Sequence, residues 1–183
     1  MSGVDPLTRL AYQAQAGDRR ALEVFVETSY DQVWRLCAAL VDGQSADDLA
    51  QETFAQAVRS LPRFRRESSA RTWLLSIARH VCLDELRGRV RQRSHHAPLD
   101  PSVGPVVSDV GGEVEAADLI GRLGPERREA FVLTQVLGLS YREAAEVCEC
   151  PIGTVRSRVA RARADLVEFL HQQAPGDLRS SSA

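Results

Sequence analysis

The chain from Ser140 to Arg163 reads SYREAAEVCECPIGTVRSRVARAR, the pattern of a short helix, a turn and a second, arginine-rich helix. Ser140 with Glu143 three residues later forms a capping box that begins the first helix. Residues 150–154, CPIGT, then interrupt the helical pattern, because proline ends a helix, glycine permits a sharp turn and threonine can cap the second helix. The stretch therefore predicts a helix-turn-helix.

The second of these helices divides into two faces on a helical wheel. Its apolar stripe, which we expect to pack against the first helix, consists of Val155, Val159, Ala162, Leu166, Phe169 and Leu170. Away from the stripe lie Ser157, Ala160, Arg161 and Ala164, with Arg156 at the edge and Arg158 and Arg163 flanking the stripe. Arginine pairs bidentately with guanine in the major groove, so this face predicts a helix that reads DNA. The alternative is an amphipathic helix with a solvated basic face.

Composition limits what the chain can be. Its 183 residues suffice for one medium or two small domains, and 44% hydrophobic residues can form a core. A formal net charge of −2 argues against a protein that coats nucleic acid indiscriminately. We find no signal peptide, and no apolar run approaches the roughly 18 residues needed to cross a membrane. We therefore expect a cytoplasmic protein without membrane insertion.

The four cysteines are Cys37, Cys82, Cys148 and Cys150, and their scatter suits a reducing compartment. Cys148 and Cys150 could suggest a metal, but a structural zinc site needs four ligands, usually from paired clusters. We expect small, partly buried cysteines, and neither a metal nor another cofactor.

The sequence predicts helices and no strand, hence an all-α fold of two small domains joined by a flexible linker. The linker is residues 94–117, SHHAPLDPSVGPVVSDVGGEVEAA, with three prolines and three glycines. It separates an N-terminal domain, 1–93, from a C-terminal domain, 118–171, and residues 172–183 form a disordered tail. The expected helices are 7–15, 18–40, 45–61, 70–91, 116–123, 125–137 and the pair of the helix-turn-helix.

Three segments resemble bacterial sigma factors of the extracytoplasmic-function (ECF) family. Residues 122–166, RLGPERREAFVLTQVLGLSYREAAEVCECPIGTVRSRVARARADL, are similar to that family's promoter-reading C-terminal domain. Residues 45–57, SADDLAQETFAQA, resemble its segment for docking on core RNA polymerase. Residues 64–87, FRRESSARTWLLSIARHVCLDELR, resemble its segment that melts and captures the −10 element. The resemblance implies a dissociable sigma subunit that directs promoter-specific initiation.

For the docking segment, the resemblance implies contact with the clamp helices of the polymerase's largest subunit. The polar residues assigned to this contact are Asp47, Asp48, Gln51 and Glu52. On the wheel an acidic, hydrogen-bonding face lies beside a buried face formed by Leu49, Ala50, Thr53 and Ala57. The alternative is a plain solvated acidic face.

For the −10 element, the resemblance assigns a loop to the flipped base and a helix to reading beside it. The assigned residues are Arg65, Arg66, Glu67, Ser68, Ser69, Arg71, Arg79 and His80. Positive charge at a helix end suits a captured single strand, while Trp73 is assigned to the core. His80 stands where the family usually has asparagine, so the −10 preference can differ and strand contact can depend on pH.

For the −35 element, the family reads DNA from positions matching Arg156, Ser157, Ala160 and Arg161. Thr154, Arg158 and Arg163 are assigned to phosphates or local packing, since phosphate contacts position a protein without specifying sequence.

The resemblance also implies two partners besides core polymerase, namely promoter DNA and an anti-sigma factor that masks one or both domains. If the unbound protein folds its domains together, we expect the surface from Arg156 to Arg163 to be buried.

Three rival interpretations remain. A stand-alone helix-turn-helix regulator would use the same DNA-reading helix but would leave the acidic helix and the arginine-serine loop without a role. An enzyme is disfavoured because the chain has only four histidines, no cluster of three acidic residues, no GxSxG motif and no phosphate loop. We therefore expect no catalytic residue. A metal or thiol sensor would rest on Cys148 and Cys150.

Overall fold

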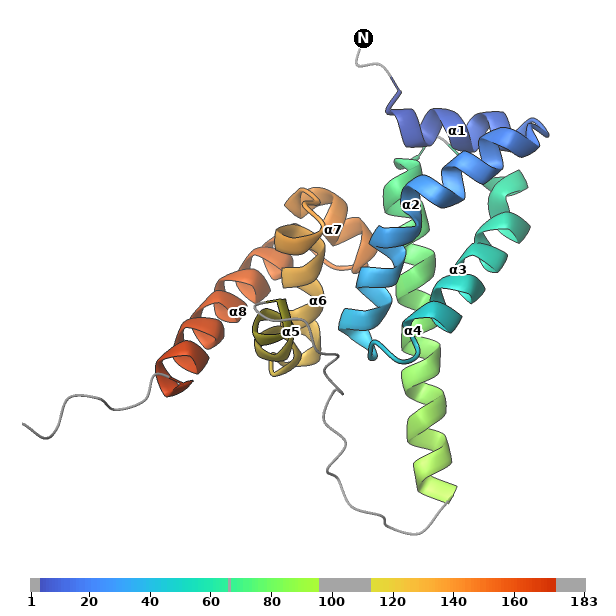
Figure 1. Ribbon diagram of the computed structural model, residues 1–183. Coiled ribbons are helices and arrows are strands. Elements are labelled where there is room, and N and C mark those ends of the chain that lie inside the picture. Colours follow the sequence, from blue (N-terminus) through green and yellow to red (C-terminus); the bar gives the residue numbers. More distant parts are fainter. Residues whose placement is uncertain (1–3, 66, 96–112, 174–183) are drawn as a thin grey trace, which may run out of the picture.

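The computed structural model describes residues 4–65, 67–95 and 113–173, and every regular element within these ranges is helical. The N-terminal domain contains α1 (Pro6–Gln15), α2 (Arg19–Leu40), α3 (Ala46–Ser60), a 3-10 turn η1 (Leu61–Arg63) and α4 (Ala70–His95). The C-terminal domain contains α5 (Glu113–Gly121), α6 (Pro125–Phe131), a π-helical turn η2 (Val132–Val136), α7 (Tyr141–Val147) and α8 (Ile152–Gln173). The expected all-α architecture with a helix-turn-helix is confirmed (Figure 1).

Side-chain caps explain where several helices begin. The carboxylate of Asp18 accepts a hydrogen bond from the backbone N–H of Ala21 at 3.1 Å and begins α2. Gly17, with φ of +99°, supplies the left-handed residue that lets the chain turn from α1 into α2. Ser140 and Glu143 form both hydrogen bonds of the predicted capping box at the start of α7.

The helix boundaries differ from expectation around the linker and in the middle of the C-terminal domain. The linker was expected to show no helix between residue 94 and the helix starting at 116, but α4 runs to His95 and α5 begins at Glu113. Residues 96–112 lie outside the described residues, as do 174–183 of the expected tail, while α8 continues to Gln173. The expected helix 125–137 divides into α6 and η2, where the N–H of Leu137 reaches back to the Val132 carbonyl.

The core of the N-terminal domain forms where α2, α3 and α4 pack together. Phe25, Leu36, Leu74 and Leu75 are almost fully buried there. Trp73 packs against this core with its ring 4.8 Å from the ring of Phe64, so its assignment to the core is confirmed.

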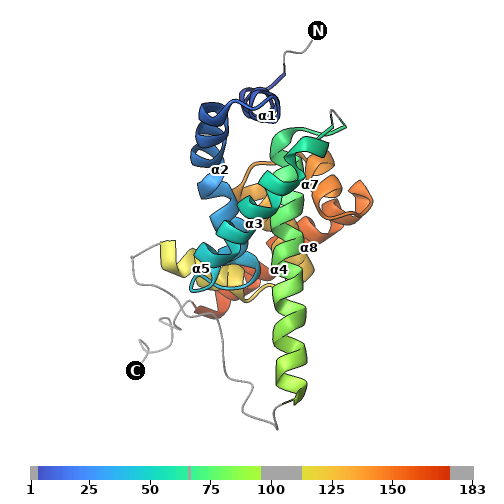
Figure 2. The ribbon, with the colours of Figure 1, turned by 90° about the vertical axis from the view of Figure 1, so that its right-hand side faces the viewer.

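The two domains pack directly against each other, with α7 against α4 and α6 against α2 (Figures 1 and 2). Their buried residues form one continuous hydrophobic cluster that runs from Leu7 in α1 to Val159 in α8. The surfaces of both domains that face this contact are therefore withdrawn from solvent.

Candidate nucleic-acid interface

Helix α8 has the two faces that its sequence predicts. Val155, Val159 and Ala162 are at most 1% exposed and hold the helix in the domain. The four residues assigned to the −35 element, Arg156, Ser157, Ala160 and Arg161, are all exposed. The apolar stripe fades toward the end of the helix, where Leu170 is 53% exposed rather than packed.

The expectation that a compact protein buries the surface from Arg156 to Arg163 is wrong. The domains do pack together, but through α4 and α7 and through α2 and α6. The exposed face of α8 lies outside that contact, so the residues assigned to the −35 element stay open to solvent in the closed arrangement.

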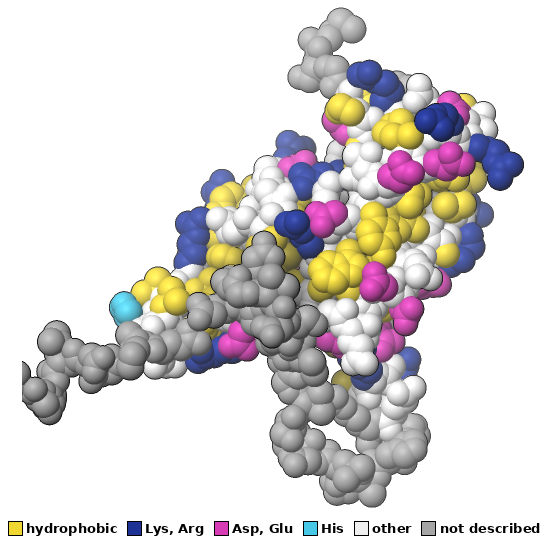
Figure 3. Space-filling model, viewed as in Figure 1, with side chains coloured by type: hydrophobic (Ala, Val, Ile, Leu, Met, Phe, Trp, Pro, Cys, Tyr) yellow, Lys and Arg dark blue, Asp and Glu magenta, His cyan; other side chains and the backbone are white. Residues whose placement is uncertain are grey.

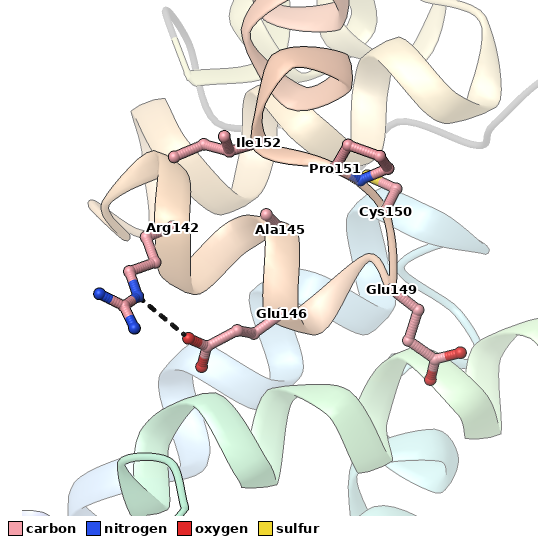
Figure 4. Close-up of a pocket in the computed structure, with 7 residues that line it drawn as sticks. All are labelled: Arg142, Ala145, Glu146, Glu149, Cys150, Pro151 and Ile152. Atoms are coloured by element: carbon pink, nitrogen blue, oxygen red, sulfur yellow. Dashed lines mark ion pairs between the residues drawn. The ribbon is translucent and has the colours of Figure 1, made fainter.

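The turn before α8 forms a shallow hollow on the surface of the helix-turn-helix (Figure 4). Ala145, Pro151 and Ile152 line it, and Arg142 lies beside it with its guanidinium 3.6 Å from Glu146. Glu149 also lines the hollow, and its carboxylate lies 2.9 Å from His80 of α4 (Figure 4). The turn thus both shapes the DNA-reading motif and reaches the other domain.

The three residues assigned to phosphates differ in their surroundings. The Arg158 side chain is 19% exposed, and its guanidinium lies 2.9 Å from the carboxylate of Glu126. Arg163 is exposed and donates a hydrogen bond to the side chain of Gln135 at 2.6 Å, whereas Thr154 is half-buried. Local packing thus accounts for Arg158, while Arg163 is available to a phosphate.

Helix α3 presents the acidic face that its sequence predicts. Asp47, Asp48, Gln51 and Glu52 are all exposed, and Leu49, Ala50, Thr53 and Ala57 on the other side are buried. Asp47 accepts a hydrogen bond from the Tyr30 hydroxyl at 2.9 Å, which raises the pKa of Tyr30. Hydrogen bonds from Gln56 and then Arg59 lower the pKa of Glu52, which keeps this carboxylate charged. The face is a preformed anionic surface.

Hydrophobic side chains are exposed next to this acidic face. In Figure 3 they gather along α2 and α3, with acidic side chains at their edge. Leu22 and Val26 are half-buried, and Val58 is 44% exposed. This mixture of apolar and anionic groups is typical of a protein-binding surface.

The loop assigned to the flipped base is open to solvent. Arg65 and Glu67 are exposed, 3.9 Å apart, and Arg66 lies outside the described residues. Ser68 and Ser69 are half-buried, and the Ser69 hydroxyl accepts the backbone N–H of Thr72 at 3.1 Å in the first turn of α4. The loop is thus anchored at its helical end and exposed at its tip.

The other three residues assigned to the −10 element contact the C-terminal domain, although His80 stays half exposed to solvent. Arg71 donates to Gln32 at 2.5 Å and to the backbone carbonyl of Leu137.

Further along α4, Arg79 forms an ion pair with Glu129 of α6, and the side chains are 15% and 9% exposed. His80 Nε2 lies 2.9 Å from the carboxylate of Glu149. All three side chains therefore contact acceptor groups of the C-terminal domain. In this respect they differ from Arg65, whose loop is open to solvent.

A half-buried arginine joins the domains at a second point. Arg128 donates hydrogen bonds to the carbonyls of Gly121 and Leu123 at the end of α5, and to the carbonyl of Ala39 in α2 at 3.3 Å. Burial lowers the pKa of Arg128. Charged groups at this depth are costly unless paired, so these contacts favour one defined docking of the domains.

The sequence did not identify the residues that contact the three assigned −10 residues or that join the domains at the second point: Gln32, Ala39, Arg128, Glu129, Leu137 and Glu149. One signal was present, because Glu129 is followed directly by the buried Ala130 and, one helical turn later, by the buried Leu133. A lone charge on a buried face indicates a buried partner, but nothing in the sequence identifies Arg79 as that partner.

Metal-binding clusters and membrane-spanning helices are not found among the described residues. Within 4–65, 67–95 and 113–173, no three or more His, Cys, Asp or Glu side chains gather as they would around a metal ion. None of the helices in these same ranges has the length and hydropathy to span a bilayer.

Comparison with known proteins agrees with this geometry. Family models of Sigma-70 region 2 and Sigma-70, region 4 match residues 25–92 and 113–166. The chain is 49% identical to the ECF RNA polymerase sigma factor SigC of Mycobacterium tuberculosis over 164 residues, 87% of this chain and 88% of that protein. It is 35% identical to the RNA polymerase sigma-H factor of Pseudomonas aeruginosa over 172 residues, 85% of this chain and 89% of that one.

Two solved structures share the fold. One is CnrH in complex with the cytosolic domain of CnrY, with a TM-score of 0.73 and 27% identity over 93% of this chain and all of that one. The other is the sigma factor RpoE in complex with the anti-sigma factor NepR from Bartonella quintana, with a TM-score of 0.73 and 28% identity over 82% and 97% of the two chains. The chain belongs to the ECF family of RNA polymerase sigma factors, which direct promoter-specific initiation of transcription.

Proposed function

We propose that this sigma factor reads the −35 element with the exposed face of α8 and reads the −10 element with the loop after η1 and the adjoining face of α4. Residues 1–93 then serve polymerase binding and −10 melting, and 118–171 serve −35 recognition. The observation that carries the proposal is the division of α8 into a fully buried face and an exposed face with Arg156 and Arg161.

The −35 assignment rests on donor chemistry. Arg156 and Arg161 can each donate two parallel hydrogen bonds to a guanine edge, and Ser157 can donate to or accept from a base. Ala160 offers only a methyl group, so it contributes shape. Thr154 and Arg163 are proposed to touch phosphates, while Arg158 supports them through Glu126.

Reading the −10 element requires the domains to separate. Arg71, Arg79 and His80 are held by acceptors of the C-terminal domain, so a single strand competes with Glu129, Glu149 and the Leu137 carbonyl. Docking on polymerase, which holds the two domains at separate sites, is proposed to expose these residues. In the unbound protein the −35 face is then exposed, whereas three of the eight residues assigned to the −10 element are engaged by the C-terminal domain.

The acidic face of α3 is proposed to dock on the clamp helices of the largest polymerase subunit. Its four polar residues are exposed and Glu52 is held in the charged form. Such a surface complements basic side chains on a partner helix.

An anti-sigma factor is proposed as a further partner. The similar RpoE was solved with the anti-sigma factor NepR, and the apolar surface along α2 and α3 gives this chain a site that a partner helix could cover. The protein is proposed to act in the cytoplasm, where polymerase and DNA are found, and to carry no catalytic activity of its own.

The test is initiation from a promoter with purified core polymerase and the full chain. Asp48→Arg places a positive charge at the centre of the acidic face and should abolish core binding and transcripts. Glu168→Arg makes the same charge change at an exposed position of α8 remote from α3 and should leave both intact. Retained duplex binding without any core binding by the unmodified chain would instead identify a stand-alone regulator.

A further inference from the structure

Helix α1 contacts the chain on both sides of the loop assigned to the flipped base, residues 65–69. It packs against η1, which leads into this loop, and against α4, which leads out of it. Figures 1 and 2 show α1 at the same end of the N-terminal domain as the start of α4. None of the residues assigned to DNA or to polymerase lies in α1, so these contacts have no role in the function proposed above.

Gln15, the last residue of α1, holds the chain where it enters the loop. Its side-chain amide donates hydrogen bonds to the carbonyls of Leu61 at 3.0 Å, Pro62 at 3.2 Å and Phe64 at 3.0 Å. A glutamine amide suits this place, because it carries two N–H groups that neighbouring carbonyls can share. Phe64 directly precedes the loop and is only 6% exposed, so Gln15 fixes the loop at a packed position.

Thr8 holds the chain where it leaves the loop. The Thr8 hydroxyl oxygen accepts a hydrogen bond from the backbone N–H of Ala70 at 2.8 Å, and the two residues are 5% and 0% exposed. Ala70 is the first residue of α4, and the first N–H groups of a helix have no acceptor within that helix. A buried N–H without an acceptor is costly, so Thr8 stabilises the start of α4 in this position.

An aromatic contact joins α1 to the loop between these two points. The ring of Tyr12 stacks 5.5 Å from the ring of Phe64, which in turn lies 4.8 Å from the ring of Trp73 in α4. Thr8, Tyr12 and Gln15 recur at helical spacing, so one face of a single helix makes all three contacts. The two ends of the loop are therefore fixed relative to each other, while its tip is exposed.

We propose that α1 positions the −10 loop, with Gln15 and Thr8 holding its two ends in the arrangement that captures a flipped base. The inference rests on the assignment of residues 65–69 to that base in the proposed function. Gln15 and Thr8 are positioning residues, because they bind the backbone on either side of the loop and act on DNA only through it.

Holding both ends of the loop favours capture of the base. A loop that is already ordered loses less conformational freedom when a base enters it. If one end is released, the loop adopts other arrangements, and the base binds only to the fraction of molecules that keeps the competent one. Helices α3 and α8 carry the faces proposed for polymerase and for the −35 element. The loss should therefore fall on the opened −10 strand alone.

Two substitutions each release one end of the loop with little change in side-chain size. Gln15→Glu replaces the N–H donor by a carboxylate that cannot donate and that faces three carbonyls. Gln13→Glu is the matched control, since it makes the same charge change at an exposed position of α1. Thr8→Val removes the acceptor of the Ala70 N–H, whereas Thr8→Ser keeps the hydroxyl and is the control at this end.

The test measures the full chain and each variant in complex with core polymerase. Fluorescence anisotropy with a labelled −10 non-template oligonucleotide gives the affinity for the strand, and the affinities for core polymerase and for −35 duplex are measured on the same preparations. We expect Gln15→Glu and Thr8→Val to weaken strand binding on the order of tenfold. Both other affinities should stay unchanged, which also shows that the variants are folded, and both control variants should bind the strand as the unmodified chain does.

Abasic oligonucleotides separate this inference from the loop assignment on which it rests. Each base of the −10 strand is replaced in turn by an abasic site. At the captured base, the replacement should weaken binding by the unmodified chain to the level of Gln15→Glu and Thr8→Val, because the variants have already lost the contribution of that base.

Three results would overturn the inference. If Arg65→Ala and an abasic site both weaken strand binding but Gln15→Glu and Thr8→Val do not, the loop captures the base without help from α1. If neither Arg65→Ala nor any abasic site weakens binding, the loop assignment fails and the inference fails with it. If Gln15→Glu and Thr8→Val lose affinity for core polymerase as well, α1 supports the whole domain rather than the loop.

Discussion

Replacing Glu129 with glutamine should open the contact between the two domains. Glu129 is the one partner of Arg79 that crosses between the domains in the described structure, and the two side chains are only 9% and 15% exposed. Glutamine has the same size as glutamate and keeps one oxygen that can accept a hydrogen bond, but it lacks the negative charge. Arg79 is then left buried against a neutral group and is better solvated when the domains separate.

The size of the effect follows from this burial. Removing one partner of a buried ion pair destabilises the state that contains it by about 3–5 kcal/mol. The lower end applies here, because glutamine can still accept one hydrogen bond. About 3 kcal/mol corresponds to a decrease of roughly a hundredfold in the ratio of closed to open protein. The affinity for a −10 single strand should rise by up to the same factor, limited by the fraction already open.

The assay uses the full chain without polymerase. Small-angle scattering reports the separation of the domains, and fluorescence anisotropy with a labelled −10 non-template oligonucleotide reports access to Arg71, Arg79 and His80. Glu126→Gln is the matched control, since it removes the same charge from α6 at a residue that pairs with Arg158 inside the C-terminal domain. An unchanged radius of gyration and unchanged strand affinity in Glu129→Gln would refute the idea that this pair holds the domains together.

Three further predictions concern single residues. Arg156→Ala should weaken binding to −35 duplex by about 1–3 kcal/mol without lowering the melting temperature, because its side chain is exposed; equal binding to matched and scrambled duplex by both proteins would contradict the assignment. Burial opposes ionisation of Asp42, but hydrogen bonds from Arg89 and Ser45 lower its pKa below the ordinary value, so Asp42 stabilises the fold above pH of about 4 and this contribution is lost as pH falls through the folded pKa. Urea unfolding should therefore show Asp42→Asn less stable than the unmodified chain at pH 7, with the difference shrinking toward pH 3. Ser140→Ala removes the hydroxyl that accepts the Glu143 N–H but keeps the bond from the backbone N–H of residue 140 to Glu143, and it should lower the stability of the C-terminal domain by about 1 kcal/mol; an unchanged unfolding midpoint would show that packing alone fixes the start of α7.

Local features of this protein could be predicted because they have local causes. The two faces of α8 and of α3 follow from side chains three or four residues apart, and the start of α7 follows from Ser140 and Glu143. For the same reason, the expected helices of the N-terminal domain agree closely with those observed.

The features that could not be predicted have non-local causes. Arg79 meets a partner 50 residues away, and Arg71 meets the Leu137 carbonyl 66 residues away. Such pairs leave no periodic signal in the sequence, so the burial of the −10 side was missed and burial of the −35 side was expected in its place. The π-helical turn at Val132–Val136 likewise lacks a proline or glycine inside it that would have indicated a change of helix type.

One residue in the turn of the helix-turn-helix is placed in a conformation that glycine would adopt more easily. Glu149 has φ of +53°, which is unfavourable by about 1–2 kcal/mol for a residue with a side chain. That same side chain supplies the contact with His80.

A glycine at position 149 would therefore make the DNA-reading motif more robust while loosening its grip on the other domain. Since the domains are proposed to separate when the −10 element is read, this one substitution would stabilise the turn while making that separation easier. A screen of variants by melting temperature alone would therefore select Glu149→Gly and would not detect the weaker contact between the domains.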